Sequence, residues 1–347
     1  MRAVRLVDWQ RDPEVVEVPE PEPGPGQVVV KVGGAGACHS DLHLLHDLPA
    51  GLLPWTPPFT LGHENAGWVH ALGEGVEGVE VGQPVAVHGA WGCGHCQRCA
   101  TGADNMCEDP AGAPVPSGGG GLGLDGGMAE LLLVPSARHL VELPDGLAPV
   151  DAAPLTDAGL TPYHAVRRSL PKLGPTATAV VIGVGGLGHL AVQILKATTS
   201  ARVVAVDTRE AALGLASRCG ADAVHLAGEA PAAVAAATKG RGAEVVLDLV
   251  GSDATLAMAA GMVRPLGDLT LVGIAGGSHP FSYVTVPREA SLQSTYWGSR
   301  TELAEVLELG ARGLLRPTTT VTDLDGAPAA YRAMAAGEVD GRVVVVP

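Results

Sequence analysis

Short apolar runs alternate with clusters of glycine and proline through the first part of the chain, up to about residue 157. Several of these runs are rich in valine and only a few residues long. Apolar runs bounded by turn-forming residues predict short strands, so this part of the chain should be mostly β. The expected strands are residues 15–18, 27–32 and 84–87.

The pattern changes from residue 176, where apolar strand-like runs alternate with longer helical segments. Such alternation is typical of βαβ units built on a parallel sheet. The expected strands are residues 179–182, 202–206, 245–249 and 269–272, and the expected helices are residues 187–197 and 210–219.

Residues 296–347 return to the first pattern and close with the valine run 343–346. We therefore expect one β-rich domain made of residues 1–157 and 296–347. An α/β domain with a doubly wound parallel sheet, residues 158–295, would be inserted into it. The glycine-rich residues 117–121 are expected to form a flexible loop.

Composition and charge narrow the class of protein. The chain has 347 residues, of which 46% are apolar, and this suits a two-domain globular protein. Its net charge of -15 argues against a nucleic-acid partner. The N-terminus lacks an apolar segment of signal-peptide length, and glycines together with His189 interrupt the uncharged residues 174–195. We therefore expect a cytoplasmic protein without a membrane span.

A glycine motif follows the first expected strand of the α/β domain and opens its first helix. Gly183 permits a tight turn, Gly185 lets the backbone approach a pyrophosphate, and Gly188 allows the helix to pack on the strand. The helix N-terminus then binds the anion through its free N–H groups. The complete motif comprises Gly183, Gly185, Gly186, Leu187 and Gly188.

An acidic residue, Asp207, closes the second expected strand of this domain. A carboxylate there accepts hydrogen bonds from the adenosine ribose and repels a 2′-phosphate, which favours NAD over NADP. Arg209 nearby leaves use of both coenzymes open. The plainer alternative is a glycine-rich turn with an Asp on the surface.

Four of the six cysteines, Cys93, Cys96, Cys99 and Cys107, lie within fifteen residues. Four thiolates close the tetrahedral shell of Zn²⁺ and leave no position for substrate, so the spacing predicts a structural zinc site. An iron–sulfur cluster is the alternative, but no electron-transfer partner is evident in the sequence. A scattered set of cysteines would have indicated disulfides instead.

The other metal-ligating residue types are ambiguous when taken singly. Cys38 and His63 could each be packed in the core rather than bind a metal. Cys219 lies on a helix of the α/β domain and is expected in the core. The histidines outside the motifs have no better interpretation than surface or satisfied core positions: His46, His70, His88, His95, His139, His164, His189, His225 and His279.

The order of these motifs resembles the zinc-containing medium-chain alcohol dehydrogenases. Cys38, the residues Gly62-His63-Glu64, the four-cysteine loop and the glycine motif follow one another as in that family. The similarity extends over the whole chain. It is greatest to bacterial NAD-dependent secondary alcohol dehydrogenases, which share residues 155–164.

This resemblance implies a GroES-like catalytic domain and a Rossmann domain that binds NAD. It implies that Cys38 and His63 bind a catalytic zinc with a third ligand near residue 157, where most relatives have Cys and this chain has Asp157. A carboxylate carries the same charge as a thiolate and is an ordinary zinc ligand. Glu64 is implied as a transient ligand.

The resemblance also assigns proton transfer and the binding of coenzyme and substrate. Ser40 would take the alcohol proton and His43 would release it to solvent, unless His43 only lines the cleft. Asp41 would orient His63. The positions implied for the coenzyme are His39 and Arg342 at the pyrophosphate and Thr161 near the nicotinamide. Val250 and Val272 are also expected to bind the coenzyme. The candidates for an apolar substrate pocket, which could instead be core residues, are Trp55, Tyr296 and Trp297.

The expected function is therefore reversible NAD-linked oxidation of alcohols, mainly secondary medium-chain or aryl ones, by a homotetramer with two zinc ions per chain. Three alternatives remain: a polyol or formaldehyde-type dehydrogenase, a zinc-free reductase of the same superfamily, and a non-catalytic redox sensor that binds zinc and nucleotide. The zinc-free reductases lack the Cys38–His63 pair, and a sensor would not need Ser40 or His43.

Overall fold

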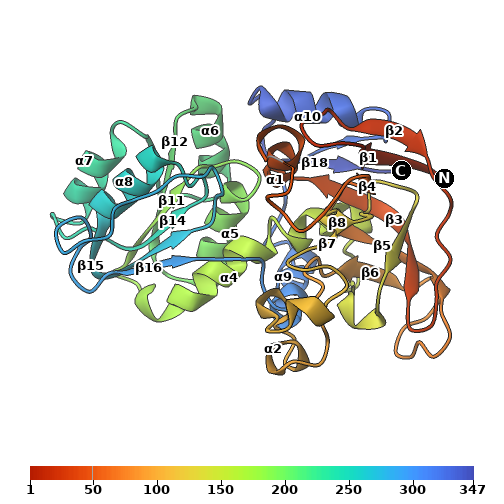
Figure 1. Ribbon diagram of the computed structural model, residues 1–347. Coiled ribbons are helices and arrows are strands. Elements are labelled where there is room, and N and C mark those ends of the chain that lie inside the picture. The colour runs from red at the N-terminus through yellow and green to blue at the C-terminus, as the bar shows by residue number, and fades with distance from the viewer. Residues whose placement is uncertain (49) are drawn as a thin grey trace. The chain divides into compact units, whose positions relative to one another are not determined.

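The structure, a computed structural model, describes residues 1–48 and 50–347. The chain divides into two compact units, one formed by Met1–Leu160 with Trp297–Pro347 and the other by Thr161–Tyr296. The first unit thus contains segments from both ends of the sequence (Figure 1). None of the described helices is long and apolar enough to cross a membrane.

The first unit is built on a seven-stranded, mostly antiparallel sheet in the order β10-β6-β5-β3-β18-β17, with β9 also paired to β3. The strand β18, drawn in blue, lies beside β3, drawn in red (Figure 1). The strands are β3 (Val28–Ala37), β5 (Glu64–Leu72), β6 (Pro84–Val87), β9 (Leu131–Val134), β10 (Leu140–Glu142), β17 (Thr319–Thr322) and β18 (Arg342–Val345).

Two smaller sheets and several short helices complete this unit. The sheets are β2 (Glu14–Glu17), β1 (Arg2–Leu6) and β4 (Phe59–Thr60) in that order, and β7 (Gly119–Gly120) with β8 (Gly123–Leu124). The helices are α1 (His39–Leu42), which continues into a π-helical turn at His43–Asp47, α2 (Gln97–Ala100), α3 (Pro149–Ala152), α9 (Arg300–Ala311) and α10 (Ala327–Ala335).

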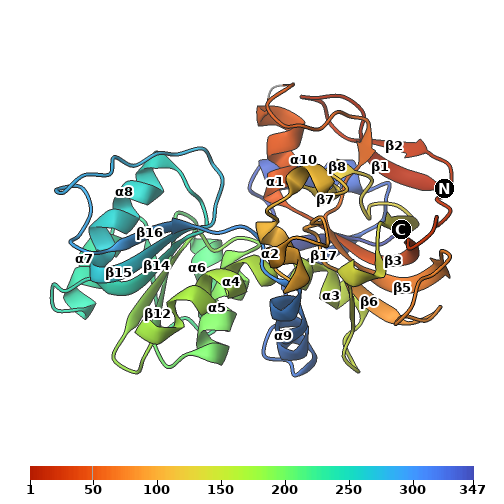
Figure 2. The same cartoon turned by 60° about the horizontal axis from the view of Figure 1, so that its bottom comes forward.

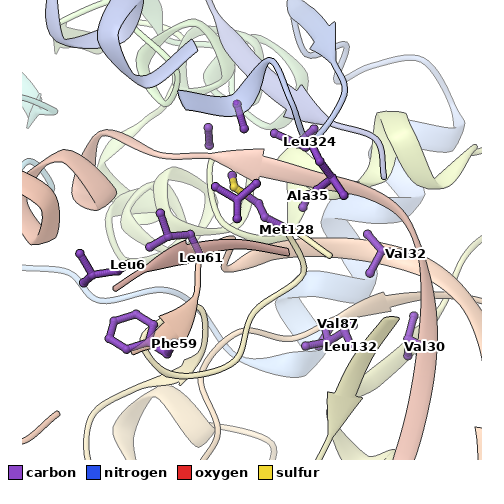
Figure 3. Packing of buried hydrophobic residues seen from close by; sticks show 14 of the residues in the cluster. Leu6, Val30, Val32, Ala35, Phe59, Leu61, Val87, Met128, Leu132 and Leu324 are labelled. Atoms are coloured by element: carbon purple, nitrogen blue, oxygen red, sulfur yellow. The ribbon is translucent and has the colours of Figure 1, made fainter. Parts of the chain in front are cut away.

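The core of the first unit gathers apolar side chains from segments that are far apart in the sequence. Figure 3 shows Leu6, Phe59, Leu61, Met128 and Leu324 among them. All of these side chains are buried to 2% exposure or less, so removing one leaves a cavity that costs about 2–5 kcal/mol.

Strand β3 is longer than the sequence pattern suggested. It runs from Val28 to Ala37, whereas the expected strand ended at residue 32. Lys31 is the one exposed residue in it, so the strand is buried on both faces and its pattern does not alternate. The added part contains three glycines, which the propensity rules place outside strands. Gly36 is needed because a Cβ there would overlap the side chain of Glu64.

The glycine-rich residues 117–121 are not the flexible loop that we expected. Gly118, Gly119, Gly120 and Gly121 are buried, and two of them form β7. A Cβ on Gly121 would lie 2.8 Å from the backbone nitrogen of His63. The run is glycine-rich because other backbone segments pack directly against it, which composition alone does not reveal.

The second unit is a six-stranded parallel sheet in the order β13-β12-β11-β14-β15-β16. Helices cover both of its faces, with α7 and α8 on one side and α4 and α5 on the other (Figure 2). The strands are β11 (Thr178–Ile182), β12 (Arg202–Asp207), β13 (Ala223–Leu226), β14 (Ala243–Asp248), β15 (Val263–Leu271) and β16 (Ser291–Ser294). The helices are α4 (Leu160–Ser169), α5 (Gly188–Thr198), α6 (Glu210–Arg218), α7 (Ala230–Ala237) and α8 (Asp253–Met262).

This topology confirms the doubly wound fold expected from the alternating strands and helices. The order reverses between β11 and β14, and the carboxyl ends of strands at such a switch point form the ligand crevice of open α/β sheets. Cys219 is not in the core as expected, because it caps the end of α6 and is half-buried.

Candidate active site

The four clustered cysteines come together around α2 in the first unit. The ligand atoms of Cys93, Cys96, Cys99 and Cys107 all lie within 4.8 Å of one another. Backbone N–H groups of the loop donate to the sulfurs, from Cys96 to Cys93 at 3.3 Å and from Cys99 to Cys96 at 3.4 Å. Such donors stabilise thiolates, and four thiolates at this separation suit a closed, tetrahedral zinc site.

The thiol groups of the cysteine loop differ in their pKa values. Hydrogen bonds from the backbone N–H groups of Cys99 and Glu108 lower the pKa of the Cys96 thiol to about 6. Burial raises the pKa of Cys99 to about 12. A buried thiol of this kind ionises when a cation is bound beside it, which Zn²⁺ provides.

A second cluster of ligands lies where several strands of the first unit end or begin. Cys38 follows β3, His63 and Glu64 stand at the start of β5, and Asp157 precedes α4. Their ligand atoms lie within 4.8 Å of one another. The Oδ2 of Asp157 is 3.6 Å from the Nε2 of His63 and 3.9 Å from the sulfur of Cys38. This donor set fits an open zinc site.

Asp41 holds two of these ligands in place. Its Oδ1 lies 3.1 Å from the Nδ1 of His63, and its Oδ2 accepts the backbone N–H of Cys38 at 2.9 Å. The hydroxyl of Tyr331, on α10, donates to the same Oδ2 at 2.8 Å. Because a carboxylate only accepts hydrogen bonds, Nδ1 of His63 carries a proton, and Nε2 is therefore the ring nitrogen that can bind a metal.

Glu64 is paired with a buried arginine from the far end of the sequence. The Nε of Arg342 donates to Oε2 of Glu64 at 2.9 Å, and its Nη2 contacts Oε1. The backbone N–H of Ala158 donates to Oε1 at 3.0 Å. Arg342 was expected at the coenzyme pyrophosphate, but its side chain is 3% exposed and contacts Glu64 and Asp157.

The charge of this cluster favours a cation. Burial disfavours a charged His63, but Asp41 and then Asp157 outweigh it, so the pKa of His63 is raised well above its usual value. Burial raises the pKa of Glu64, against the opposing effect of Arg342. The carboxyl groups of Asp41, Glu64 and Asp157 lie together with Cys38, and Arg342 contacts two of them, so the cluster is acidic and suits a divalent cation.

The residues expected to transfer protons lie on α1 and on the π-helical turn after it. The Oγ of Ser40 is 3.4 Å from the Nε2 of His63. The Nδ1 of His43 is 2.6 Å from the Oδ2 of Asp47. The rings of His39 and His43 make an edge contact with centroids 6.2 Å apart, and burial lowers the pKa of His39.

The three aromatic residues expected in a substrate pocket have different surroundings. Trp297 is buried with its ring 5.8 Å from the ring of His63. Trp55 is packed in the core of the first unit and donates its indole N–H to the carbonyl of Pro116 at 2.9 Å. Tyr296 belongs to the second unit and is 38% exposed.

The glycine motif of the second unit forms the turn between β11 and α5. Gly183 has a φ of +86°, which a residue with a Cβ rarely adopts. A Cβ on Gly188 would overlap the carbonyl of Gly183, so the helix can approach the strand only with glycine there. Leu187 is the residue that precedes α5. A Cβ on Gly185 would meet no atom within 4 Å, so the space beside this residue is open. The space beside Gly185 fits a bound pyrophosphate.

Asp207 stands at the end of β12 and is tied to this turn. Its Oδ2 accepts the backbone N–H of Val184 at 2.7 Å, and its Oδ1 accepts that of Arg209 at 3.0 Å. At the ends of the next strands, Val250 lies against the Cα of Gly183, and Val272 donates its N–H to Asp248. The side chain of Thr161 is buried at the start of α4.

Comparison with known proteins identifies the family. Residues 24–145 match the alcohol dehydrogenase GroES-like domain and residues 186–312 match the zinc-binding dehydrogenase family. An NAD-dependent alcohol dehydrogenase of Sulfurisphaera tokodaii is 34% identical over the full length of both chains. The crystal structure of the alcohol dehydrogenase of Aeropyrum pernix covers all of both chains with 38% identity and a TM-score of 0.91. A D-arabinose 1-dehydrogenase (NADP(+)) of Saccharolobus solfataricus is 34% identical over 96% of this chain and 93% of its own.

The chain belongs to the zinc-containing medium-chain alcohol dehydrogenase family. It is an NAD-dependent oxidoreductase that acts on CH–OH groups. Cys38, His63 and Glu64 form its catalytic zinc site, and the four-cysteine loop forms its structural one. The expected enzyme class, coenzyme and metal are thus confirmed, and the redox-sensor and zinc-free alternatives are not supported.

Two contacts of this site could not be recognised in the sequence. Tyr331 donates to Asp41 across 290 positions, and Arg342 donates to Glu64 across 278. No spacing or motif links residues so far apart, and only the fold of the first unit brings them together. A buried arginine does leave one weak signal, since Arg342 opens an otherwise apolar strand.

Proposed function

We propose that this alcohol dehydrogenase oxidises secondary alcohols, of medium chain length or with an aryl group, reversibly to ketones. The observation that carries the proposal is the buried cluster of Cys38, His63 and Asp157 with the Ser40 hydroxyl beside it. We take Asp157 as the third ligand, as the resemblance of the sequence to secondary alcohol dehydrogenases implies. The buried ring of Trp297 supplies an apolar neighbour for the substituents of such an alcohol.

In the proposed reaction, the zinc, Ser40 and His43 have separate roles. Bound zinc acidifies a hydroxyl and polarises a carbonyl. Ser40 accepts the proton of the alcohol, because its hydroxyl lies 3.4 Å from the ligating nitrogen of His63. His43 releases that proton to solvent. Since the carboxylate of Asp47 can only accept, the hydrogen of a neutral His43 is on Nδ1, and its Nε2 is free to take up the proton.

We assign coenzyme binding to the residues of the glycine motif, together with Asp207 and Arg209. The carboxylate of Asp207 favours the ribose of NAD, and the nearby Arg209 would have to dominate for a 2′-phosphate to bind. We assign His39 to the pyrophosphate and Thr161 to the nicotinamide, with Val250 and Val272 also contacting the coenzyme. Arg342 acts there through Glu64 and Asp157, the two carboxylates that it contacts. The division into a catalytic unit and a coenzyme unit follows from this assignment.

We further propose that the protein is a homotetramer. Large apolar side chains are exposed on one segment of the second unit, with Phe281 at 77%, Tyr283 at 85% and Val284 at 87%. Strand β16 is at the edge of the sheet, where its second side can pair with another chain. Light scattering after size exclusion would give four chains per particle, and a monomer would contradict the proposal.

The substrate proposal is tested by NAD reduction with primary, secondary and aryl alcohols and with aldose sugars, on protein whose zinc content is measured in parallel. We expect two zinc ions per chain and the highest kcat/KM for a secondary alcohol. A higher value for primary alcohols would contradict the proposal. A higher value for D-arabinose or another aldose would instead support the polyol-type alternative, which the D-arabinose 1-dehydrogenase relative illustrates.

A further inference from the structure

Trp297 has a backbone conformation that requires an explanation. Its φ is +51°, a value that is unusual for a bulky residue and costs about 1–2 kcal/mol. It is also the residue at which the chain returns to the first unit. Its ring is 6% exposed and lies 5.8 Å from the ring of the zinc ligand His63. Surrounding contacts must therefore hold this residue in place.

His88, the residue that follows β6, makes the contact that can do so. Its Nε2 lies 2.8 Å from the carbonyl oxygen of Gly298, the residue after Trp297. Its Nδ1 lies 3.1 Å from the carbonyl oxygen of Ala90. Burial lowers the pKa of His88, so the ring is neutral and has one N–H to donate. The shorter distance assigns that hydrogen to Nε2 and to Gly298.

His88 is itself fixed on all sides. Its backbone N–H donates to the carbonyl of His139 at 2.8 Å, and its carbonyl accepts the indole N–H of Trp91 at 2.9 Å. Its side chain is fully buried and makes an edge contact with the ring of Trp297, with centroids 6.3 Å apart. The hydrogen bond to Gly298 therefore starts from a rigid support.

The indole ring of Trp297 packs directly against Gly89. A Cβ on Gly89 would overlap two ring carbons of Trp297, so the ring occupies the space that a side chain at position 89 would fill. On the other side of Trp297, the backbone N–H of Arg300 donates to the carbonyl of Gly102 in the cysteine loop at 2.9 Å. The segment from 297 to 300 is thus fastened at both ends.

We propose that His88 is a positioning residue that sets the substrate selectivity of the enzyme. By donating to Gly298 it holds Trp297 in its left-handed conformation over Gly89. The indole is then a fixed wall beside His63 that limits the size of the groups on the alcohol carbon. This inference rests on the proposed oxidation of secondary alcohols.

Two substitutions of His88 separate this role from simple packing. In His88→Gln the amide nitrogen takes the place of Nε2 and can still donate to Gly298. In His88→Asn the amide nitrogen takes the place of Nδ1 and can donate only toward Ala90. The readout is the ratio of kcat/KM for 2-propanol to that for 1-phenylethanol. We expect His88→Asn to change this ratio by about tenfold in favour of the larger alcohol, and His88→Gln to keep it within about twofold.

A second substitution, at Gly89, displaces the Trp297 ring without changing the hydrogen bond from His88 to Gly298. Gly89→Ala places a methyl group where the Trp297 ring lies, so it should shift the ratio in the same direction as His88→Asn. Equal effects of His88→Asn and His88→Gln would overturn the proposal. So would an unchanged ratio in Gly89→Ala, which keeps the test decisive even if His88→Asn does not fold.

A fluorescence measurement keeps this inference separate from the proposed function. Acrylamide quenching of Trp297, obtained as the difference from the same protein carrying Trp297→Phe, should increase in His88→Asn and Gly89→Ala but not in His88→Gln. Zinc content should remain at two ions per chain in all of them. If no alcohol is oxidised but quenching follows this pattern, the proposed substrate fails while the positioning of Trp297 by His88 stands. Unchanged quenching in both variants would overturn the positioning itself.

Discussion

At the scale of single residues, Asp157 is the proposed zinc ligand that most sharply distinguishes this site. Its carboxylate lies within 4 Å of both the Cys38 sulfur and the His63 ring nitrogen. Aspartate is a harder donor than cysteine, but its carboxylate has the same charge as a thiolate. The role of Asp157 can be tested without changing its size.

We expect Asp157→Asn to lose most of the catalytic zinc and at least about a hundredfold in kcat, because a neutral amide is a poor zinc ligand. Metal analysis and steady-state kinetics check this. The matched control is Asp157→Cys, which keeps an anionic ligand and should retain the zinc. Full activity and two zinc ions per chain in Asp157→Asn would show that Asp157 is not a ligand.

His139 connects a single residue to the acid stability of the fold. Its ring is 1% exposed and lies 6.0 Å from the ring of Trp91. Burial lowers the pKa of His139 well below its usual value of 6.5, and the nearby Arg138 lowers it further. The folded state therefore keeps this histidine neutral under conditions where the unfolded state takes up a proton.

Stability from His139 is thus fully present above pH 6.5 and is lost as the pH falls from 6.5 toward the lowered pKa of the folded state. The loss is about 1.4 kcal/mol per pH unit within that window. We expect His139→Phe to flatten the decline of the thermal midpoint between pH 7.5 and pH 5.8 relative to the parent protein. Parallel curves for the two proteins would exclude His139 as a source of acid sensitivity.

How well each part of the site could be predicted depends on how far apart its residues are in the sequence. The cysteine loop and the glycine motif could be predicted because the residues of each lie within one short segment, where their spacing in the sequence determines the geometry. The pairing of Arg342 with Glu64 could not, since a strand from the far end of the sequence brings it about. The role of His88 left no signal either, because a buried histidine looks the same in sequence whether it supports the core or holds Trp297.

At the scale of elements, the buried glycine run 118–121 supports the segment that carries His63. Gly121 has a φ of +84°, and a Cβ on it would lie 2.6 Å from the carbonyl carbon of Gly62. Gly82 has a similar φ of +88° but faces open space. These two positions share the backbone strain of an added side chain and differ only in packing.

We expect Gly121→Ala to lower stability by about 1–3 kcal/mol more than Gly82→Ala, since it adds an overpacked contact to the same strain. It should also reduce occupancy of the catalytic zinc by moving His63. Denaturation midpoints and metal content of the two variants provide the measurement. If the two variants proved equally stable, the run would be no more than a turn.

The fold itself was predictable to the extent that its elements follow local patterns. The parallel sheet of the second unit could be predicted because alternation of strands and helices determines its class. The extent of β3 could not, because its glycines fit the strand only through contacts with β5 and α3. Valine runs located the strands, and tertiary packing decided their length.

At the scale of the whole molecule, the two zinc sites should differ in how easily they lose metal. The structural site is closed by four sulfurs, whereas the catalytic site must keep a position for substrate. We expect brief treatment with a chelator to abolish activity while the thermal midpoint stays within a few degrees of its starting value. Prolonged treatment should remove the second ion and lower the midpoint. Activity and midpoint falling together from the start would show that one metal serves both purposes.

The position of β18 has a consequence for how the protein is made. Glu64 is buried beside Arg342, which follows it by 278 residues. A ribosome adds about 5–20 residues per second, so Arg342 is synthesised roughly 15–55 s after Glu64. The second unit, being one continuous segment, can fold on the ribosome during that interval. We therefore expect insertion of the catalytic metal to be a late event of biosynthesis, after translation has delivered the strand that completes its surroundings.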